Sequence, residues 1–270
     1  MASLTRAAGG PPVLLRLGRA ACAATTGLVA PLAALVLWAA LAQLDWLPAQ
    51  ILPPPDQVWE TGRSMWDAGD IVHHASFSLL RVLEGFALGA AVGLALGVAM
   101  GLSPRIEDYV RPLFTAIAQV PALGWIPLLM LLVGIDEALK VLVIAKAALV
   151  PVTLNTLSGI RTVPLAHVEV ARTFRYSQAQ LLGRIVLPAA VPPIFTGIRY
   201  GLTHAWLALV AVELLASSEG LGYLLVWGRQ MFWLDTLLVA MIVIGIIGFA
   251  SDKLLAAVEA RLQRWRTDGV

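Results

Sequence analysis

The sequence predicts an all-α polytopic membrane protein with six transmembrane helices. Hydrophobic residues make up 59% of the 270 residues and charged residues only 13%, and the mean hydropathy is +0.81. Soluble globular domains are much less apolar than this. The chain is long enough for several membrane spans of about 20 residues each. A soluble fold is a poor alternative, because it would lack the polar surface needed to cover six such segments.

Six apolar segments have the length and composition of transmembrane helices. They are residues 27–44, 85–102 and 113–133, which contain no charged residue, and residues 138–158, 189–212 and approximately 232–251. Together they predict a transmembrane domain over 27–258, preceded by an N-terminal segment, 1–26, and followed by a C-terminal tail, 259–270.

Positive charges are unevenly distributed over the segments that connect these spans. If the N-terminus is inside, thirteen Lys and Arg residues lie in the inner segments, and three, Arg63, Arg81 and Arg229, lie in the outer ones. Cytoplasmic segments of membrane proteins carry the excess of Lys and Arg. We therefore expect both termini and the polar loop 159–188 to be cytoplasmic.

The longest outer segment, 45–84, has the features of an elbow followed by a helix at the membrane surface. Pro53-Pro54-Pro55 cannot continue a helix and predicts extended backbone. Asp56 would cap a short amphipathic helix whose apolar face meets the membrane interface. The residues expected on that face are Val58, Trp59, Met65 and Trp66.

Glycine recurs at every fourth position of the second span, at Gly85, Gly89, Gly93, Gly97 and Gly101. In a helix this spacing leaves a groove along one face, where another helix can approach closely within the lipid. The pattern is compatible with static tight packing and with a sliding seam used in alternating access.

Helix-breaking residues interrupt the third and fourth spans. Pro121, Gly124 and Pro127 lie in the third span and Pro151 lies in the fourth. Proline bends a helix and frees a backbone carbonyl, and broken helices at membrane depth occur inside protein or along a cavity. We expect residues 119–127 to face the protein interior, with ordinary kinks as the alternative.

A sequence motif in the loop 159–188 points to a function. The loop contains Glu169-x-Ala171-x3-Arg175-x9-Ile185-x-Leu187-Pro188. This spacing resembles the cytoplasmic coupling loop of the membrane subunits of bacterial ABC importers, which usually reads Glu-Ala-Ala-x3-Gly-x9-Ile-x-Leu-Pro. Two positions depart from the family pattern: Val170 replaces an alanine, and Arg175 replaces the glycine at the turn between two short helices.

The resemblance implies the fold of a type I ABC importer permease, whose coupling loop docks two short helices on a separate ATPase subunit. It implies that Glu169 orients the loop and that Ala171 is small to allow close contact. A glycine at position 175 would permit left-handed backbone without steric cost. An arginine there requires a different turn or a compensating contact with the ATPase. The coupling residues expected on this basis are Glu169, Ala171, Arg172, Arg175, Gly183, Ile185, Leu187 and Pro188.

The resemblance extends over about 52–262. It is carried by Leu52-Pro53-Pro54-Pro55, Ser78-Leu79-Leu80-Arg81-Val82, Gly134-Ile135-Asp136-Glu137-Ala138-Leu139-Lys140, and Ala211-Val212-Glu213 with Gly220-Leu221-Gly222. These segments are similar to permeases for nitrate, taurine and aliphatic sulfonates. The resemblance implies a multi-pass protein of the bacterial inner membrane that pairs with a second permease copy, two ATPase subunits and an extracytoplasmic solute-binding protein. ATP and Mg would be bound by the ATPase, and no cofactor by this chain.

Ionisable residues in the predicted spans indicate the charge of the solute that crosses the membrane. An ionised group there is unfavourable unless it is paired or hydrated. Lys140 is one turn from the outer face and can extend its ammonium to water, whereas Lys146 is about 9 Å deeper. A cationic lining favours an anion such as a sulfonate or nitrate. The candidate pathway residues are Gln119, Lys146, Arg199, His204 and Glu213.

Structural roles are also open for two of these residues. Arg199 can brace the coupling loop or bind backbone carbonyls. Glu213, at the outer end of the fifth span, can gate the pathway, contact the solute-binding protein or terminate its helix.

Other function classes fit less well. The chain has no Gly-x4-Gly-Lys-Ser/Thr phosphate loop, so it is not itself the ATPase, and we expect a non-catalytic subunit. It has no Cys/His cluster of the kind that binds metal, and a net charge of +2 gives no reason to expect nucleic acid. The rival class is an ion-coupled secondary transporter. That class needs acidic residues at mid-membrane, and none is predicted there.

Overall fold

The computed structural model describes residues 29–44, 48 and 51–262, except for the side chains of Leu165 and Arg172. The N-terminal segment 1–26 and most of the tail 259–270 therefore lie outside the described residues. The chain divides into two units, residues 1–60 and 61–270. In the first unit, the apolar helix Val29–Gln43 precedes the proline elbow, and Trp38 Nε1 donates a hydrogen bond to the Pro53 carbonyl at 3.0 Å.

Every regular element among the described residues is a helix. The short amphipathic helix expected after the elbow is α2 (Pro55–Asp67). The helices that follow are α3 (Asp70–Leu102), α4 (Pro104–Gln119), η1 (Ala122–Trp125), α5 (Ile126–Val133), α6 (Glu137–Arg161), α7 (Leu165–Thr173), α8 (Gln178–Leu181), η2 (Leu182–Val186), α9 (Leu187–Ala216), α10 (Leu221–Gln230) and α11 (Leu234–Leu262).

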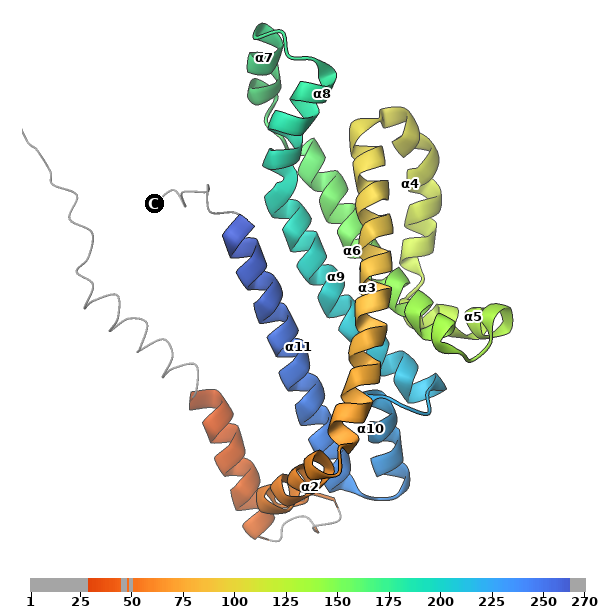
Figure 1. The fold of residues 1–270 in the computed structure, drawn as a ribbon, viewed down its shortest axis with the longest axis vertical. Helices are drawn as coiled ribbons and strands as arrows, with labels where there is room; N and C mark the ends of the chain where they lie inside the picture. The colour runs from red at the N-terminus through yellow and green to blue at the C-terminus, as the bar shows by residue number, and fades with distance from the viewer. Residues whose placement is uncertain (1–28, 45–47, 49–50, 263–270) are drawn as a thin grey trace, which may run out of the picture. The chain divides into compact units, whose positions relative to one another are not determined.

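Three long helices, α3, α6 and α9, form the centre of the second unit, with α6 packed between the other two (Figure 1). The glycines of α3 face α6: a Cβ atom on Gly85 would lie 2.6 Å from Cβ of Ile144, and one on Gly97 would lie 2.6 Å from Cβ of Thr156. These distances are too short for any side chain, so glycine is what permits this approach. The close helix contact predicted from the four-residue spacing is confirmed.

Four helices are long and apolar enough to cross a membrane: Asp70–Leu102, Glu137–Arg161, Gln178–Ala216 and Leu234–Leu262. The pair formed by α4 and η1–α5 is a fifth candidate, bent by 92° at its break. The helix Val29–Gln43 is apolar but shorter. The described residues thus contain four or five candidate spans, and the six predicted from hydropathy stay a prediction.

The second span is longer than predicted. The helix α3 begins at Asp70 rather than Gly85 and has 33 residues, or about 50 Å at 1.5 Å per residue, against a hydrocarbon core of about 30 Å. Arg81, which was expected in the outer connecting segment, is therefore part of this helix and is buried. Hydropathy missed the first part of α3 because Arg81 and its charged neighbours lower the average.

The third span is broken where its prolines predicted. The helix α4 ends at Gln119, and the chain turns through Val120 and Pro121 into the short helix η1. Pro151, in contrast, does not interrupt α6, which is continuous over 25 residues. One turn after Pro151, the Asn155 side chain donates a hydrogen bond at 2.8 Å to the Pro151 carbonyl.

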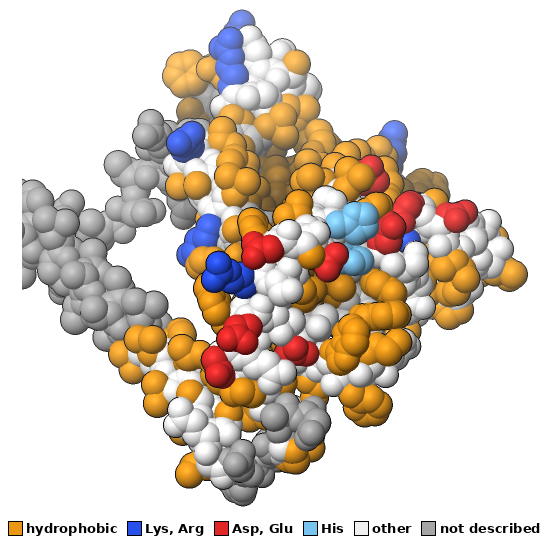
Figure 2. All heavy atoms as spheres, turned by 60° about the horizontal axis from the view of Figure 1, so that its bottom comes forward, with side chains coloured by type: hydrophobic (Ala, Val, Ile, Leu, Met, Phe, Trp, Pro, Cys, Tyr) orange, Lys and Arg blue, Asp and Glu red, His pale blue; other side chains and the backbone are white. Residues whose placement is uncertain are grey.

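The two ends of the second unit carry different elements (Figure 1). The coupling-loop end carries α7 and α8, the turn between α3 and α4, and the last turn of α11. The opposite end carries the start of α3 and the connection between α9 and α10. Figure 2 looks onto this opposite end and shows Asp and Glu side chains gathered around the histidines.

Candidate functional site

The loop between α6 and α9 folds as two short helices, as the resemblance implied. The first, α7, is followed by α8, which continues through a π-helical turn, η2, directly into α9. Ser177 begins α8 with a capping box: its hydroxyl accepts from Gln180 N at 3.3 Å, and its own N–H donates to the Gln180 side chain at 2.9 Å. Both hydrogen bonds satisfy donors that a helix start leaves free, so the second helix is fixed at its beginning.

The turn between the two helices has the geometry that glycine would provide. Arg175 has a φ of 54°, and Tyr176 N donates to the Ala171 carbonyl at 3.1 Å. This hydrogen bond and the left-handed residue before its donor define a Schellman cap at the end of α7. Arg175 therefore adopts the left-handed backbone that a glycine would adopt without strain, at a cost of roughly 1–2 kcal/mol.

The coupling loop has a buried face and an exposed face. Ala171 is 2% exposed and packs with Leu181, Ile160, Val186 and Ala190 in one apolar cluster. This cluster fastens both short helices to the ends of α6 and α9.

The opposite face of the loop is apolar at its centre and charged around it. Val170 is 56% and Phe174 74% exposed, and the charged residues Glu169, Arg175 and Arg184 are exposed beside them. Of the other expected coupling residues, Gly183, Leu187 and Pro188 are exposed and Ile185 is partly buried. The Arg172 side chain lies outside the described residues.

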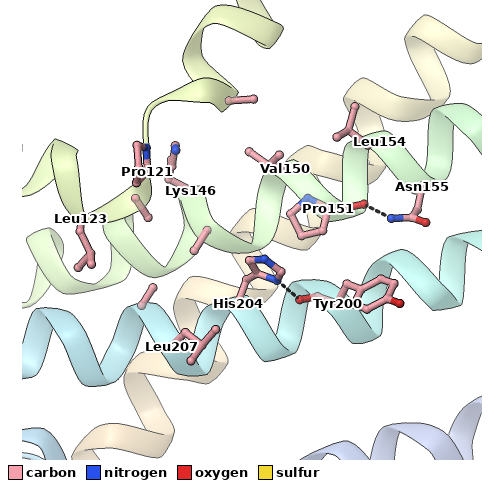
Figure 3. A pocket seen from close by; sticks show the side chains of 14 residues that line it. Pro121, Leu123, Lys146, Val150, Pro151, Leu154, Asn155, Tyr200, His204 and Leu207 are labelled. Carbon is pink, nitrogen blue, oxygen red and sulfur yellow. Dashed lines mark hydrogen bonds between the residues drawn. The ribbon is translucent and has the colours of Figure 1, made fainter.

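A cavity of about 670 Å³ lies where the break of the third span meets α6 and α9 (Figure 3). Its lining includes two of the five predicted pathway residues, Lys146 and His204, together with Tyr200 and Asn155. The Lys146 ammonium donates to the Val120 carbonyl at the end of α4. The imidazole of His204 bonds through Nδ1 to the Tyr200 carbonyl at 2.8 Å. Gln119 is exposed at the end of α4 and is not among the lining residues.

The other two predicted pathway residues lie elsewhere. Arg199 donates to Asp252 of α11 at 3.0 Å and lies 3.4 Å from Glu259 on the same helix, so it joins α9 to α11. Neither of the two structural roles considered for it, bracing the coupling loop or binding carbonyls, anticipated this pair of carboxylates. Glu213 is buried near the end of α9, in a charged cluster at the opposite end of the unit.

That cluster is centred on Arg81, which is only 2% exposed. Its guanidinium donates to both carboxylate oxygens of Glu137, at 2.6 and 2.7 Å, and to Glu213 Oε1 at 2.6 Å. The Ser78 hydroxyl and the Gly222 N–H also donate to Glu213, at 2.9 and 2.8 Å. The cluster thus joins α3, α6, α9 and the start of α10.

Lys140 belongs to the same cluster and does not extend to water as expected. Its side chain is buried and donates to Glu137 Oε1 at 2.6 Å. Arg81, Lys140 and Glu213 are buried, whereas the Glu137 side chain is 56% exposed. The two cations and two carboxylates neutralise each other, which is the condition for burying charge. Sequence reasoning missed Arg81 and Glu137 as a pair, although both lie in the segments that carry the family resemblance.

Comparison with known proteins gives a consistent result. Residues 89–264 match the family described as binding-protein-dependent transport system inner membrane component. The chain is 35% identical to a putative aliphatic sulfonates transport permease protein of Bacillus subtilis, over 89% of this chain and 87% of the relative. It is 34% identical to the taurine transport system permease protein of Escherichia coli, over 86% of each chain.

Two further comparisons extend the set. The bicarbonate transport system permease protein of Synechococcus elongatus is 33% identical over 70% of this chain and 66% of its own length. Among solved structures, an inward-facing conformation of the MetNI methionine ABC transporter matches with a TM-score of 0.55 at 18% identity, covering 67% of this chain and 93% of that chain. This last likeness concerns the fold.

Proposed function

The chain belongs to the family of binding-protein-dependent transport system inner membrane components, and we propose on this basis that it imports a small anionic solute. In this proposal it is the permease subunit of an ATP-driven importer, forms the pathway through the membrane, and carries out no chemistry itself. A separate ATPase subunit binds ATP and Mg, and the coupling loop transmits its movement.

The observation that carries the proposal is the two-faced coupling loop. Val170 and Phe174 leave a large apolar surface in water, which monomeric proteins expose mainly at interaction sites. The buried face, in contrast, is fastened to the ends of α6 and α9 through Ala171 and Leu181. A force applied to the exposed face would therefore reach the two helices that line the cavity.

The proposed partners follow from this assignment. Two ATPase subunits need two coupling loops, so the permease would pair with a second copy of itself. A solute-binding protein outside the membrane would deliver the solute. The charge distribution supports a cytoplasmic position for the coupling loop and both termini, on the side where ATP is found. The family description supports a location in the inner membrane.

An anionic solute is supported by two features. The relatives are named for aliphatic sulfonates and bicarbonate, which are anions, and for taurine, which carries a sulfonate. The cavity of this chain contains Lys146, whose charge would replace part of the hydration that an anion loses on entering. The Arg199 guanidinium does not contribute, because Asp252 and Glu259 already neutralise it.

Ion-coupled secondary transport is the rival reading, and Glu213 is the residue it would require. This carboxylate is buried, but it accepts hydrogen bonds from Arg81, Ser78 and Gly222. These donors all belong to the protein and occupy both carboxylate oxygens, so Glu213 is part of a fixed structural cluster and offers no open position to a coupling ion.

The test is uptake by proteoliposomes that contain the permease, its ATPase and its binding protein. Uptake of ethanesulfonate, taurine or bicarbonate should require ATP and Mg on the side of the ATPase and should stop with Glu169→Arg, which reverses a charge on the exposed loop face. Uptake that continues without ATP and follows a proton or sodium gradient would contradict the proposal.

A further inference from the structure

We propose that Lys146 is the group that binds the anionic solute, and that binding detaches the end of α4 from α6. The inference rests on the proposed function and deepens it, because it names the residue that recognises the solute and the helix that responds. It is argued from the two contacts that hold α4 against α6, from the charges in the spans, and from the position of the cavity.

The helix α4 is attached to α6 near both of its ends, each time through a cation of α6. Near its start, Glu107 is buried and pairs with Arg161, the last residue of α6, as well as with Arg111 at 2.8 Å. Just past its end, the Val120 carbonyl accepts from Lys146. The two contacts show that α4 runs antiparallel to this half of α6, with Arg161 at the entry to the coupling loop and Lys146 at the cavity.

These two attachments differ in strength. The contact between Glu107 and Arg161 joins two full charges, whereas the contact between Lys146 and Val120 joins an ammonium to a neutral carbonyl. Both hydrogen bonds are strengthened by an ionised group, but only the first also has the Coulomb attraction between two opposite unit charges. The attachment at the cavity is therefore the weaker of the two, and the one that an incoming ligand can replace.

Lys146 differs from the other two cations of α6, Lys140 and Arg161, and from the arginines Arg81 on α3 and Arg199 on α9. Within the part of the chain that the structure describes, Arg81, Lys140, Arg161 and Arg199 each contact a carboxylate, whereas Lys146 contacts only a carbonyl. An uncompensated charge in a membrane span is costly and marks a candidate solute site. An anion in the cavity would supply the missing counter-charge.

The end of α4 and an anion cannot easily share this ammonium. The last carbonyls of a helix carry a partial negative charge of about −0.5, and Val120 follows the last residue of α4 directly. An anion bound to Lys146 would lie beside this negative helix end and repel it. The anion therefore favours a state in which Val120 has moved away from Lys146, and α4 is then held to α6 by Glu107 and Arg161 alone.

This arrangement would connect solute binding in the cavity to the movement of the coupling loop. The same helix, α6, carries Lys146 in the cavity and Arg161 at the coupling loop, and α4 touches both. Release of α4 at the cavity would leave it free to turn about the contact next to the coupling loop. The solute would thereby prepare the permease for the movement that the ATPase drives.

The test uses the reconstituted importer and whichever of ethanesulfonate, taurine and bicarbonate the wild-type protein takes up fastest. The first readout is the uptake rate of Lys146→Gln, which removes the charge, and of Lys146→Arg, which keeps it. The second readout is the rate at which Gln119→Cys, exposed at the end of α4, reacts with a maleimide in a Cys22→Ser background, with and without the anion-loaded binding protein. Lys140→Gln is the matched control, because that lysine lies on the same helix but outside the cavity lining. Its partner Glu137 is 56% exposed and keeps both hydrogen bonds from Arg81, so this change leaves no buried charge unpaired.

We expect Lys146→Gln to lower uptake at least tenfold, and Lys146→Arg and Lys140→Gln to keep it within about threefold of wild type. The anion should raise the labelling rate of Gln119→Cys at least twofold in the wild-type and Lys140→Gln backgrounds and leave it unchanged with Lys146→Gln. Uptake by Lys146→Gln within twofold of wild type, or an unchanged labelling rate with Lys146 present, would overturn the inference. If Lys146→Gln fails to fold, the wild-type labelling response and the uptake by Lys146→Arg still test the inference. Absence of ATP-driven uptake by the wild-type protein would instead reject the proposed function.

Discussion

Arg81 and Glu213, which are 132 positions apart in the sequence, meet across 2.6 Å between Nη1 and Oε1 in a region closed to solvent. Arg81 comes from α3 and Glu213 from α9. The second edge of the guanidinium binds Glu137 at the start of α6. One side chain thus fixes the relative positions of the three central helices at the end opposite the coupling loop.

Breaking this contact from one side should destabilise the protein strongly. Arg81→Met leaves Glu213 buried without its cation, and loss of one partner of a buried ion pair costs about 3–5 kcal/mol. We expect a clearly lower midpoint of thermal unfolding in detergent, measured by tryptophan fluorescence. The double variant Arg81→Met/Glu213→Met should recover part of the loss, because no unpaired charge remains on α9. Equal stability of the single variant and the wild type would contradict the role assigned to Arg81.

The glycine seam between α3 and α6 should tolerate no side chain. A Cβ atom on Gly89 would collide with the carbonyl of Ala145, and the backbone of α6 cannot move aside without displacing the buried cluster around Ile144. Overpacking of this kind costs typically about 1–3 kcal/mol, so Gly89→Ala should lower the unfolding midpoint. Gly245→Ala and Gly248→Ala are matched controls on α11, where a Cβ meets nothing within 4 Å. Helix propensity alone would raise the midpoint for all three changes, so an unchanged or higher midpoint for Gly89→Ala would contradict the seam.

Replacing Arg175 should separate the geometry of the turn from a contact with the ATPase. Arg175→Gly removes the strain of a left-handed arginine and should stabilise the loop by about 1 kcal/mol, seen as slower amide exchange in α7. Arg175→Ala removes the same charge but keeps most of the strain. If both variants reduce solute-stimulated ATPase activity equally, arginine is present for the ATPase. If neither variant reduces the activity, the Arg175 side chain makes no contact that the ATPase needs.

The exposed apolar face of the coupling loop should supply the main contact with the ATPase. Phe174 is 74% exposed, and truncation of an aromatic anchor at an interface commonly costs about 2 kcal/mol or more. Phe174→Ala should therefore weaken association of the ATPase with the permease at least tenfold, as measured by titration in nanodiscs. Phe232→Ala is the control, because Phe232 is 80% exposed at the opposite end. Similar losses for the two variants would contradict the docking surface.

Much of this architecture could be predicted from local patterns in the sequence. Spacing of four between glycines predicted the closest helix contact, because the residues responsible lie on one face of one helix. The motif from Glu169 to Pro188 implied two short helices through its resemblance to the coupling loop of ABC importers. Prolines at 121 and 127 predicted the break in the third span. Each of these signals is contained in a short segment.

What could not be predicted depends on partners that are distant in the sequence. Arg81 looked like a residue of a polar outer loop, since its charge is acceptable inside a helix bundle only with Glu137 and Glu213 in place. Arg199 looked like a pathway cation until α11 supplied Asp252 and Glu259. The depth of Lys146 in its span was visible in the sequence, but the burial of Lys140 against Glu137 depends on the fold.

The claim on which the account depends most is that the coupling loop faces the cytoplasm. The most direct measurement is the labelling of Arg184→Cys, exposed on the same loop, in a Cys22→Ser background by a membrane-impermeant maleimide. The account predicts labelling in inverted membrane vesicles and protection in intact right-side-out vesicles, with further protection when the ATPase is bound. Labelling from the outside of right-side-out vesicles would contradict it.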